Sequence, residues 1–463
     1  MQRLSPLDAS FLHIESGSSP MHIASTAIFE GPPPGAEAVL RMVKSKLPLV
    51  PRYRQKVRFV PLELGRPVWV DDPHFNLDYH VRHTALPAPG SDEQLRNLIG
   101  RIMSQALDRA KPLWEMWIVE GLEDGHWAII SKSHHAMVDG VSGTDLLAVM
   151  LDSSPDPERP APPTWEPELE QSSVQFLGSA VAERVFNPYE AFRSARSLVM
   201  RPRRLLSEVA TTAKGLTSMR NLVIRPTALT SLNGAIGPHR RYTWARGHVS
   251  DVKQIRGALG GTLNDVVLAV ITHGFRQLLQ SRGEEVAGRT VRTLVPVSVR
   301  KGDQNGSYDN RVSAMFAELP VGLEDPVERL RSISEQLKGL KESQQAVAGE
   351  TLTSLAGFAP PALLAAGTRV ALRMPQRSLN TVTTNVPGPR VQLYAAGRKM
   401  LEAFPYVPLA GQVRIGVAIF SYLDSLNFGV TGDYDSNPDL DILPQGITAG
   451  LADLKKAAEA SRG

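Results

Sequence analysis

The chain has 463 residues, of which 42% are hydrophobic and 21% charged, with a formal net charge of +4 and no cysteine. This composition is typical of a folded globular protein, and it excludes disulfide bonds, thiolate metal sites and a cysteine nucleophile. The modest net charge and the 6% of aromatic residues argue against a nucleic-acid-binding module. The N-terminus lacks a signal-peptide pattern, and no uncharged apolar run approaches the ~18 residues of a membrane span, so we expect a cytoplasmic protein without a spanning helix.

A proline-rich segment divides the chain into two parts. Five prolines fall between Pro155 and Pro163, a density that is typical of a linker. The length is also more than a single domain usually reaches. We therefore predict an N-terminal domain over residues 1–152, a linker over 153–180 and a C-terminal domain over 181–463.

Strand and helix signals in the N-terminal part surround one polar motif. Residues 114–120 and 126–132 are rich in Trp, Ile and Val and are separated by an Asp-Gly turn signal, which predicts a hairpin. Residues 141–152 carry leucine and methionine at helical spacing. The intervening stretch HHAMVDG, residues 134–140, is therefore expected where a strand ends and a helix begins.

The C-terminal part also alternates between helix and strand patterns. Two segments have helical apolar spacing, and two others are rich in Val and Thr like strands, the second being broken by Pro-Gly-Pro. In chain order they are the helix 261–283, the strand 289–300, the helix 360–374 and the strand 378–394. This alternation on both sides of the linker predicts an α/β or α+β sandwich in each half.

A basic and partly apolar stretch follows the linker. Between Arg184 and Arg204 there are six arginines against one acid, Glu190, interleaved with large apolar residues. Such a pattern suits an anionic membrane surface, and it equally suits a solvated helix whose arginines pair with neighbouring acids.

The paired histidines of the motif have three possible roles: binding a metal, filling a core or moving a proton. Neighbouring side chains on a strand point to opposite faces, and the HExxH signature is absent, so we expect no metal. Satisfied core histidines beside a simple Asp139-Gly140 turn are the structural alternative. Because an imidazole accepts a proton near neutral pH, a general base is the functional hypothesis. Asp139 then either orients a histidine or pairs with an arginine that locks the loop.

The nucleophile that this base would activate is not evident in the protein. The chain has no G-x-S-x-G elbow and no cysteine, which argues against an α/β hydrolase. It also lacks the dinucleotide fingerprint G-x-G-x-x-G and the phosphate-binding loop G-x-x-x-x-G-K-[ST]. We therefore expect the substrate to supply the attacking group.

Residues 134–140 match the HHxxxDG motif of the CoA-dependent acyltransferase superfamily. The chain more closely resembles the bacterial wax ester synthase/acyl-CoA:diacylglycerol acyltransferase family, over nearly its whole length. The further stretches that carry this resemblance, in the order in which they occur, are LSPLDASFL, PMHI, PLWEMWIVEGL, NDVVLA, VPVSVR and TNVPGP.

The resemblance implies a fold and a set of catalytic roles. The fold would be a pseudo-symmetric pair of chloramphenicol-acetyltransferase-like domains, with an interdomain tunnel that acyl-CoA and the acceptor enter from opposite sides. His135 would be the catalytic base, while His134 and Asp139 would support it and Gly140 would complete the motif. Arg300 is the arginine that we suggest as the partner of Asp139.

The same resemblance suggests substrate-binding residues in the C-terminal part. These are Asn264, Asp265 and Asn385, and the Asn264 amide is a candidate to stabilise charge on the reaction intermediate. The structural alternative for Asn264 is a helix N-cap, a position that Asn strongly favours.

The function implied is an O-acyltransferase that makes triacylglycerol from diacylglycerol and acyl-CoA, with wax esters from long-chain alcohols as a second activity. Acyl-CoA would be a co-substrate, with no bound cofactor and no metal. Peripheral attachment to the inner membrane face or to lipid droplets would give access to such acceptors. The alternatives are a superfamily enzyme with another acceptor or carrier, and a lipid-binding paralogue with little activity. His134 and Asp139 also satisfy the HxxxxD spacing of glycerolipid acyltransferases, although the other stretches do not support that fold.

Overall fold

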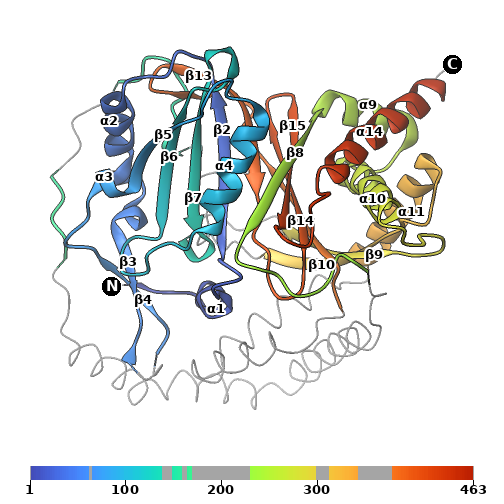
Figure 1. Cartoon of the computed structure of the whole chain (residues 1–463), viewed down its shortest axis with the longest axis horizontal. Coiled ribbons are helices and arrows are strands. Elements are labelled where there is room, and N and C mark those ends of the chain that lie inside the picture. Colours follow the sequence, from blue (N-terminus) through green and yellow to red (C-terminus); the bar gives the residue numbers. More distant parts are fainter. Residues whose placement is uncertain are drawn as a thin grey trace, which may run out of the picture.

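Two large sheets dominate the fold (Figure 1). The computed structural model describes residues 2–61, 65–137, 149–158, 164–168, 230–298, 312–342 and 378–461. In these residues two six-stranded sheets and one three-stranded sheet are packed with helices. The predicted sandwich of mixed helices and strands in each half is therefore confirmed.

The first sheet carries the strands around the histidine motif. Its order is β12-β13-β2-β7-β6-β5. The bounds are β2 His22–Phe29, β5 Val81–Ala85, β6 Trp114–Glu120, β7 Trp127–His134, β12 Tyr394–Ala395 and β13 Arg398–Tyr406. Strands β6 and β7 pair antiparallel and are joined through a turn in which Asp124 and Gly125 have φ of 59° and 68°, which confirms the predicted hairpin.

Among the described residues, four α-helices belong to the first half of the chain. They are α1 Pro6–Ile14, α2 Ala36–Lys46, α3 Leu77–His80 and α4 Asp92–Ser104. Helix α4 begins with a capping box in which Ser91 and Gln94 satisfy each other's backbone N–H groups. The buried side chains of α4 pack against the first sheet and against aromatic residues of the second half, so α4 lies between the two sheets (Figure 1).

A small sheet and two 3-10 turns complete this half. The sheet has the order β1-β4-β3, with β1 Gln2–Arg3, β3 Gln55–Arg58 and β4 Val68–Asp71. The turns η1 Leu47–Leu49 and η2 Pro51–Arg54 lead from α2 into β3.

The second sheet has the order β10-β9-β11-β14-β15-β8. Its strands are β8 Arg240–His248, β9 Val291–Ser298, β10 Val312–Leu319, β11 Thr381–Pro387, β14 Ile415–Tyr422 and β15 Ser425–Asp433. Strands β9 and β11 confirm the two strands predicted in this part, and β11 ends at the predicted Pro-Gly-Pro break because proline cannot donate to a sheet ladder.

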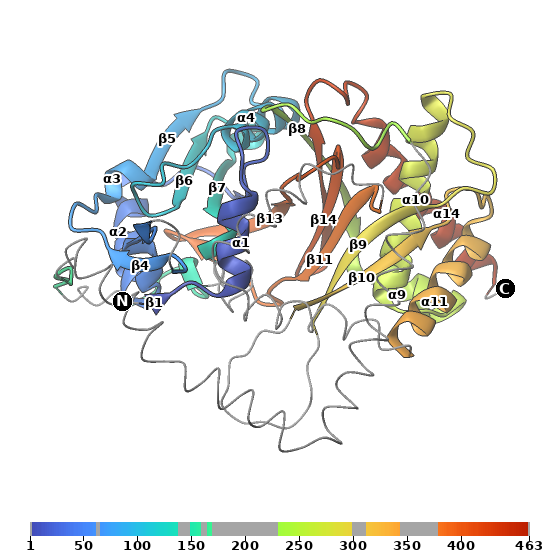
Figure 2. The ribbon, with the colours of Figure 1, turned by 90° about the horizontal axis from the view of Figure 1, so that it is seen from below.

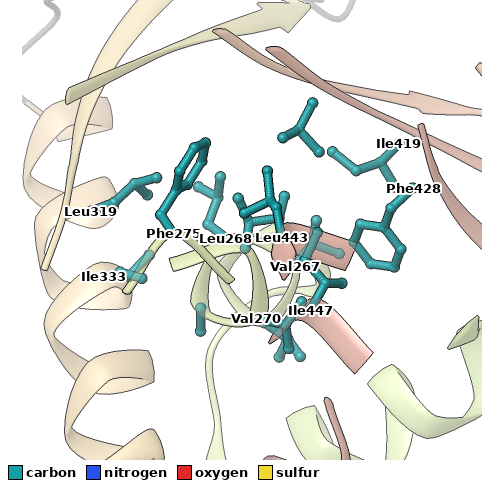
Figure 3. Packing of buried hydrophobic residues seen from close by; sticks show 14 of the residues in the cluster. Val267, Leu268, Val270, Phe275, Leu319, Ile333, Ile419, Phe428, Leu443 and Ile447 are labelled. Carbon is teal, nitrogen blue, oxygen red and sulfur yellow. The ribbon is translucent and has the colours of Figure 1, made fainter. Parts of the chain in front are cut away.

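Helix α10, Leu263–Ser281, is the centre of the second core. It is hydrophobic over most of its circumference, as expected of a helix buried on several sides. Helices α9 Val249–Leu259, α11 Pro326–Glu342 and α14 Ile442–Ala460 surround it. Figure 3 shows Val267, Leu268 and Phe275 of α10 packed among residues of α11, α14 and the second sheet.

One segment of the predicted C-terminal domain lies in the first sheet. Residues 394–406 contain β12 and β13, which are strands of that sheet. Strand β13 pairs with β2 and covers what would otherwise be an unpaired edge, a long-range pairing that no local pattern reveals. It also lies against β15, where a Cβ on Gly429 would stand 1.8 Å from the Pro405 carbonyl oxygen.

Ion pairs join the two halves around α4. Arg246 of β8 donates to Asp92 at 2.7 Å and to Glu402 of β13 at 2.7 and 2.9 Å. Arg96 of α4 donates to Asp441 at 3.0 Å. The placement of the two sheets is therefore held by paired charges as well as by apolar packing.

Several sequence predictions fall on residues outside the described ranges. These are most of the helix at 141–152, the basic stretch at 184–206, the helix at 360–374 and much of the linker. Within the described ranges no single helix combines the length and apolar composition needed to cross a membrane. Helices α9 and α10 meet that criterion only as a pair, which is bent by 102°.

Candidate active site

The two histidines lie at the point where strand β7 ends. His134 is the last residue of β7, and His135 begins a 3-10 turn, η5 His135–Met137. The His134 N–H donates to the Leu113 carbonyl at 2.9 Å, and the His135 N–H donates to the Met21 carbonyl at 2.8 Å. This confirms the predicted strand end, and it gives the two imidazoles different surroundings. Asp139, Gly140 and Arg300 lie outside the described residues.

His134 is buried, with 1% of its surface exposed. The Ala136 backbone N–H donates to its Nδ1 at 3.0 Å, so Nδ1 carries a lone pair. In the neutral ring the proton is then on Nε2, which lies 3.5 Å from Glu15 Oε1. This tautomer directs the His134 N–H toward a carboxylate.

Glu15 is the centre of a polar cluster that extends from the buried His22 and His134 to Arg109 at the surface. Its Oε1 lies 3.3 Å from His22 Nε2 and accepts the Met21 backbone N–H at 3.2 Å, while its Oε2 accepts from Arg109 at 2.6 Å. Burial favours the protonated form of Glu15, but the contacts with His134, His22 and Arg109 outweigh burial and hold the pKa of this carboxyl well below its usual range. Glu15 is therefore an anion that aligns two histidines.

His22 faces His134 across the pair of strands β2 and β7. The two residues are direct partners in the register, and their ring centroids are 6.0 Å apart. Burial lowers the pKa of His22 to about 4. The His22 ring is therefore neutral at pH 7, and its contact with Glu15 is a polar contact rather than a full ion pair.

Lys132, two residues before His134 and on the same face of β7, anchors the strand to α4. Its ammonium is fully buried and donates to the carbonyls of Ile102 at 2.9 Å and Gln105 at 2.5 Å, at the C-terminal end of α4. Burial lowers the pKa of Lys132 to about 8. A cation at the C-terminus of a helix is favoured by the helix dipole, so this contact ties the motif strand to α4.

Four further residues belong to the site although no motif in the sequence marked them: Glu15, His22, Arg109 and Lys132. Two of the quoted stretches, LSPLDASFL and PMHI, do flank Glu15 and include His22. The signal was present as a block of sequence, but only the pairing of β2 with β7 shows why it matters.

His135 stands apart from this cluster and stacks on Phe11 of α1. The ring centroids are 3.9 Å apart and the planes are inclined by 25°. Figure 2 shows α1 beside the end of β7, and α1 contacts η5. Burial lowers the pKa of the His135 imidazole to about 4, so the ring is neutral at pH 7 and has a lone pair able to accept a proton.

Asn264 and Asn385 come together in the second half. The Asn385 amide donates to Asn264 Oδ1 at 3.3 Å, across 121 residues of sequence. The helix cap of α10 is Thr262, whose side chain accepts from the Asp265 N–H, so the N-cap interpretation of Asn264 is wrong. Because its oxygen is engaged by Asn385, Asn264 keeps its amide N–H groups for another acceptor.

Asp265 belongs to the capping box of α10. Its Oδ2 accepts the Thr262 backbone N–H at 2.8 Å, and the residue is 2% exposed. A contact between Asp265 and the substrate stays a prediction. The Asp265 carboxylate already accepts a hydrogen bond that caps α10.

The described residues thus form two polar groups, one around His134 and His135 and one at Asn264 and Asn385. In the part of the chain that the structure describes, no three His, Asp or Glu side chains are arranged to hold a metal ion. The chemistry available is proton acceptance by a neutral imidazole and hydrogen-bond donation by an amide.

Comparison with known proteins identifies the family. Residues 4–267 match the model of the wax ester synthase/diacylglycerol acyltransferase catalytic domain, and residues 308–455 match that of the C-terminal domain of the same family. The chain belongs to this family. It is accordingly an acyltransferase, as the resemblance in the sequence implied.

Individual relatives are similar to this chain over nearly all of its residues. A probable diacylglycerol O-acyltransferase of Mycobacterium tuberculosis is 40% identical over 456 residues, covering 98% of this chain and 96% of the relative. The structure of a wax ester synthase/diacylglycerol acyltransferase from Marinobacter aquaeolei is 25% identical, with a TM-score of 0.70 and coverage of 99% and 100%. A trichothecene 15-O-acetyltransferase of Fusarium sporotrichioides, 10% identical, shares the fold with a TM-score of 0.62 over 98% of this chain and 94% of its own. The predicted fold class is confirmed.

Proposed function

We propose that the protein transfers a long-chain acyl group from acyl-CoA to the hydroxyl of diacylglycerol and so makes triacylglycerol. The observation that carries the proposal is a neutral histidine, His135, directly after β7 in a chain that matches both domain models of this family. Acyl-CoA is a co-substrate in this scheme, and no bound cofactor or metal takes part. The name of the Mycobacterium tuberculosis relative supports diacylglycerol as the acceptor.

His135 acts as general base in the proposed reaction. Its imidazole accepts the proton of the acceptor hydroxyl while that oxygen attacks the thioester carbonyl. The tetrahedral intermediate then collapses, the carbon–sulfur bond breaks, and the imidazolium returns its proton to the CoA thiolate. The low pKa of His135 favours the second transfer, because its imidazolium is a strong acid in this buried setting.

Asn264 stabilises the negative charge of the intermediate in this scheme. A positioned amide donor is effective in such a role because it is oriented before the charge develops. Asn385 supports the proposal, because its hydrogen bond engages Asn264 Oδ1 and leaves the amide N–H groups available.

His134 has a supporting role. Its burial and its contact with Glu15 suit a residue that fixes the end of β7, and with it the direction of the His135 side chain. Asp139, Gly140 and Arg300 are assigned to the same support by their match to the family motif alone.

The acceptor enters a tunnel between the two sheets, opposite the acyl-CoA entrance. Wax ester formation from long-chain alcohols is a second activity of the same site. The protein works at a membrane or lipid-droplet surface, where both acceptors are dissolved, and attaches peripherally.

The test is CoA release from palmitoyl-CoA by purified protein, with diacylglycerol and hexadecanol as parallel acceptors. A thiol reagent is suitable because the chain has no cysteine. We expect release that depends on diacylglycerol and falls by ~100-fold or more in His135→Ala, with the product confirmed as triacylglycerol.

Faster release with hexadecanol would make wax ester synthesis the main activity. Absence of release with either acceptor would indicate a different acceptor or carrier, or a lipid-binding paralogue. Release unchanged in His135→Ala would refute the role of the base.

A further inference from the structure

A pocket on the outer side of the first half is not used by the proposed reaction. Its volume is about 830 Å³, within the ~300–1,000 Å³ range of small-molecule sites. It lies between α2, the turns that follow it, α3 and the linker segment 164–168. None of its lining residues belongs to the histidine cluster or to the asparagine pair.

Helix α2 presents one face to this pocket and another to the core. Val39, Met42 and Val43 are fully buried against the first sheet. Leu40 and Lys44, four residues apart and hence on one face of the helix, line the pocket instead. The pocket wall formed by α2 is therefore both apolar and cationic.

Arg54 is a cation at this pocket with no anionic hydrogen-bond partner. It belongs to the pocket lining, and its Nε is buried without a hydrogen-bond partner among the described residues. Its guanidinium instead lies 4.6 Å from the centroid of the Trp165 ring. Arg54 is only partly buried, so the rest of its guanidinium can reach the pocket, and an N–H without an acceptor favours binding of an anion there.

The other cations of the pocket differ in their pairing. Arg41 forms an exposed ion pair with Glu37, at 3.4 Å. Lys44 forms no ion pair within the part of the chain that the structure describes. Arg54 and Lys44 are thus the cations available to a ligand. The carboxylate of Asp78 also lines the pocket, and that of Asp71 acts on Arg54 electrostatically while it accepts from Gln55 and from the Glu168 N–H.

Trp165 closes the pocket from the linker. Its ring meets Phe75 edge to face, with centroids 6.4 Å apart and planes at 83°. The segment is fastened by the Glu168 backbone N–H, which donates to Asp71 at 3.1 Å. Two rings at this angle leave no parallel slot for a flat base. Arg54 lies over Trp165 and His80 stacks on Phe75, so the ring surface left at the pocket suits a narrow, flexible apolar chain.

We propose that this pocket binds a single-chain lipid anion, with its head group on Arg54 and Lys44 and its chain against Leu40, Phe75 and Trp165. An inorganic anion alone would leave most of the volume and all of the apolar wall unused. The shared chemistry is an oxyanion on an alkyl chain, and the head group is a carboxylate or a phosphate. The site is separate from the proposed acyl-transfer site and does not depend on that activity.

Binding is measured by calorimetry with the full-length protein, using palmitate and hexadecyl phosphate below their micelle concentrations. Inorganic phosphate and methyl palmitate serve as probes that carry only the anion or only the chain. The variants are Arg54→Gln with Lys44→Gln, and separately Trp165→Ala, so that loss of charge and loss of the apolar wall are tested independently. Lys253→Gln, at an exposed position of α9, is the matched control.

We expect both charged lipids to bind, with affinity at least ~10-fold lower in the charge variant, as for loss of a charge-assisted hydrogen bond, and also lower in Trp165→Ala. The better of the two ligands identifies the head group. His135→Ala and Lys253→Gln should bind like the wild type. Equal binding of inorganic phosphate or methyl palmitate, or affinity unchanged in the charge variant, would overturn the proposal, and so would a loss of binding in His135→Ala.

Discussion

The two polar groups of the candidate site are built on opposite principles. Around His134, the largely buried carboxylate of Glu15 contacts two histidines, an arginine and a backbone N–H. At Asn264 a single hydrogen bond from Asn385 joins two neutral amides. A buried charge is tolerated only with many partners, whereas a neutral amide needs few and keeps donors for a ligand. The group around His134 is thus suited to stabilising the local structure, and the pair of Asn264 and Asn385 is suited to binding the substrate.

The sharpest test of this contrast is Asn264→Ala. If the amide donates to the intermediate, its removal should lower kcat by ~100-fold, the effect of losing one oxyanion donor, while the unfolding free energy changes little. Steady-state kinetics with palmitoyl-CoA and diacylglycerol measure the first, and urea denaturation the second. Asn97→Ala, an exposed asparagine on α4, is the matched control. Equal kcat in both variants would contradict the role.

Glu15→Gln tests the charged group. We expect kcat to fall by ~10-fold, because His134 loses its anionic partner, and we expect the protein to lose ~3 kcal/mol of stability, as in other broken buried pairs. Kinetics and urea denaturation report the two effects. Glu37→Gln, which removes an exposed carboxylate from an ion pair on α2, should change neither. A Glu15→Gln variant as stable and as active as the wild type would show that Glu15 neither aligns His134 nor stabilises the fold.

Lowering the pH should destabilise the cluster around Glu15, because His22 is a titratable group, whereas the amides of Asn264 and Asn385 do not titrate. As pH falls, unfolded chains protonate His22 near pH 6.5, but the folded state does so only near its lowered pKa of about 4. The unfolded state therefore binds more protons in this window, so stability falls with pH, by ~2 kcal/mol between pH 7 and pH 5 for this residue. Urea denaturation across this range should show a shallower slope in His22→Gln, and an unaltered slope would refute the assignment.

The smallest effect is expected for Asn385→Ala. The change leaves Asn264 in place but free to rotate, so we expect a loss of ~3-fold to 10-fold in kcat, with little change in KM. Kinetics of the double variant with Asn264→Ala complete a mutant cycle. A double variant no worse than Asn264→Ala alone would support positioning through Asn264, whereas fully additive losses would indicate an independent role.

Local patterns predicted much of this fold. The β6–β7 hairpin followed from alternating apolar residues and an Asp-Gly turn, and α10 followed from its apolar period. Strand β13 did not follow from its position, because its partner β2 lies more than 350 residues away in sequence. For the same reason the position of the predicted linker does not tell which strands share a sheet.

The sequence by itself determined that a histidine pair ends a strand, that no cysteine chemistry takes part, and to which family the chain is similar. Those properties depend on residue types and on the spacing of residues that are close in sequence, and both can be taken directly from the sequence. Tertiary structure alone decided that Glu15 aligns His134, that His135 stacks on Phe11, and that Asn264 meets Asn385 instead of capping its helix. Each of these contacts joins segments that are distant in sequence, and a hydrogen bond or a stacked ring depends on distance in space.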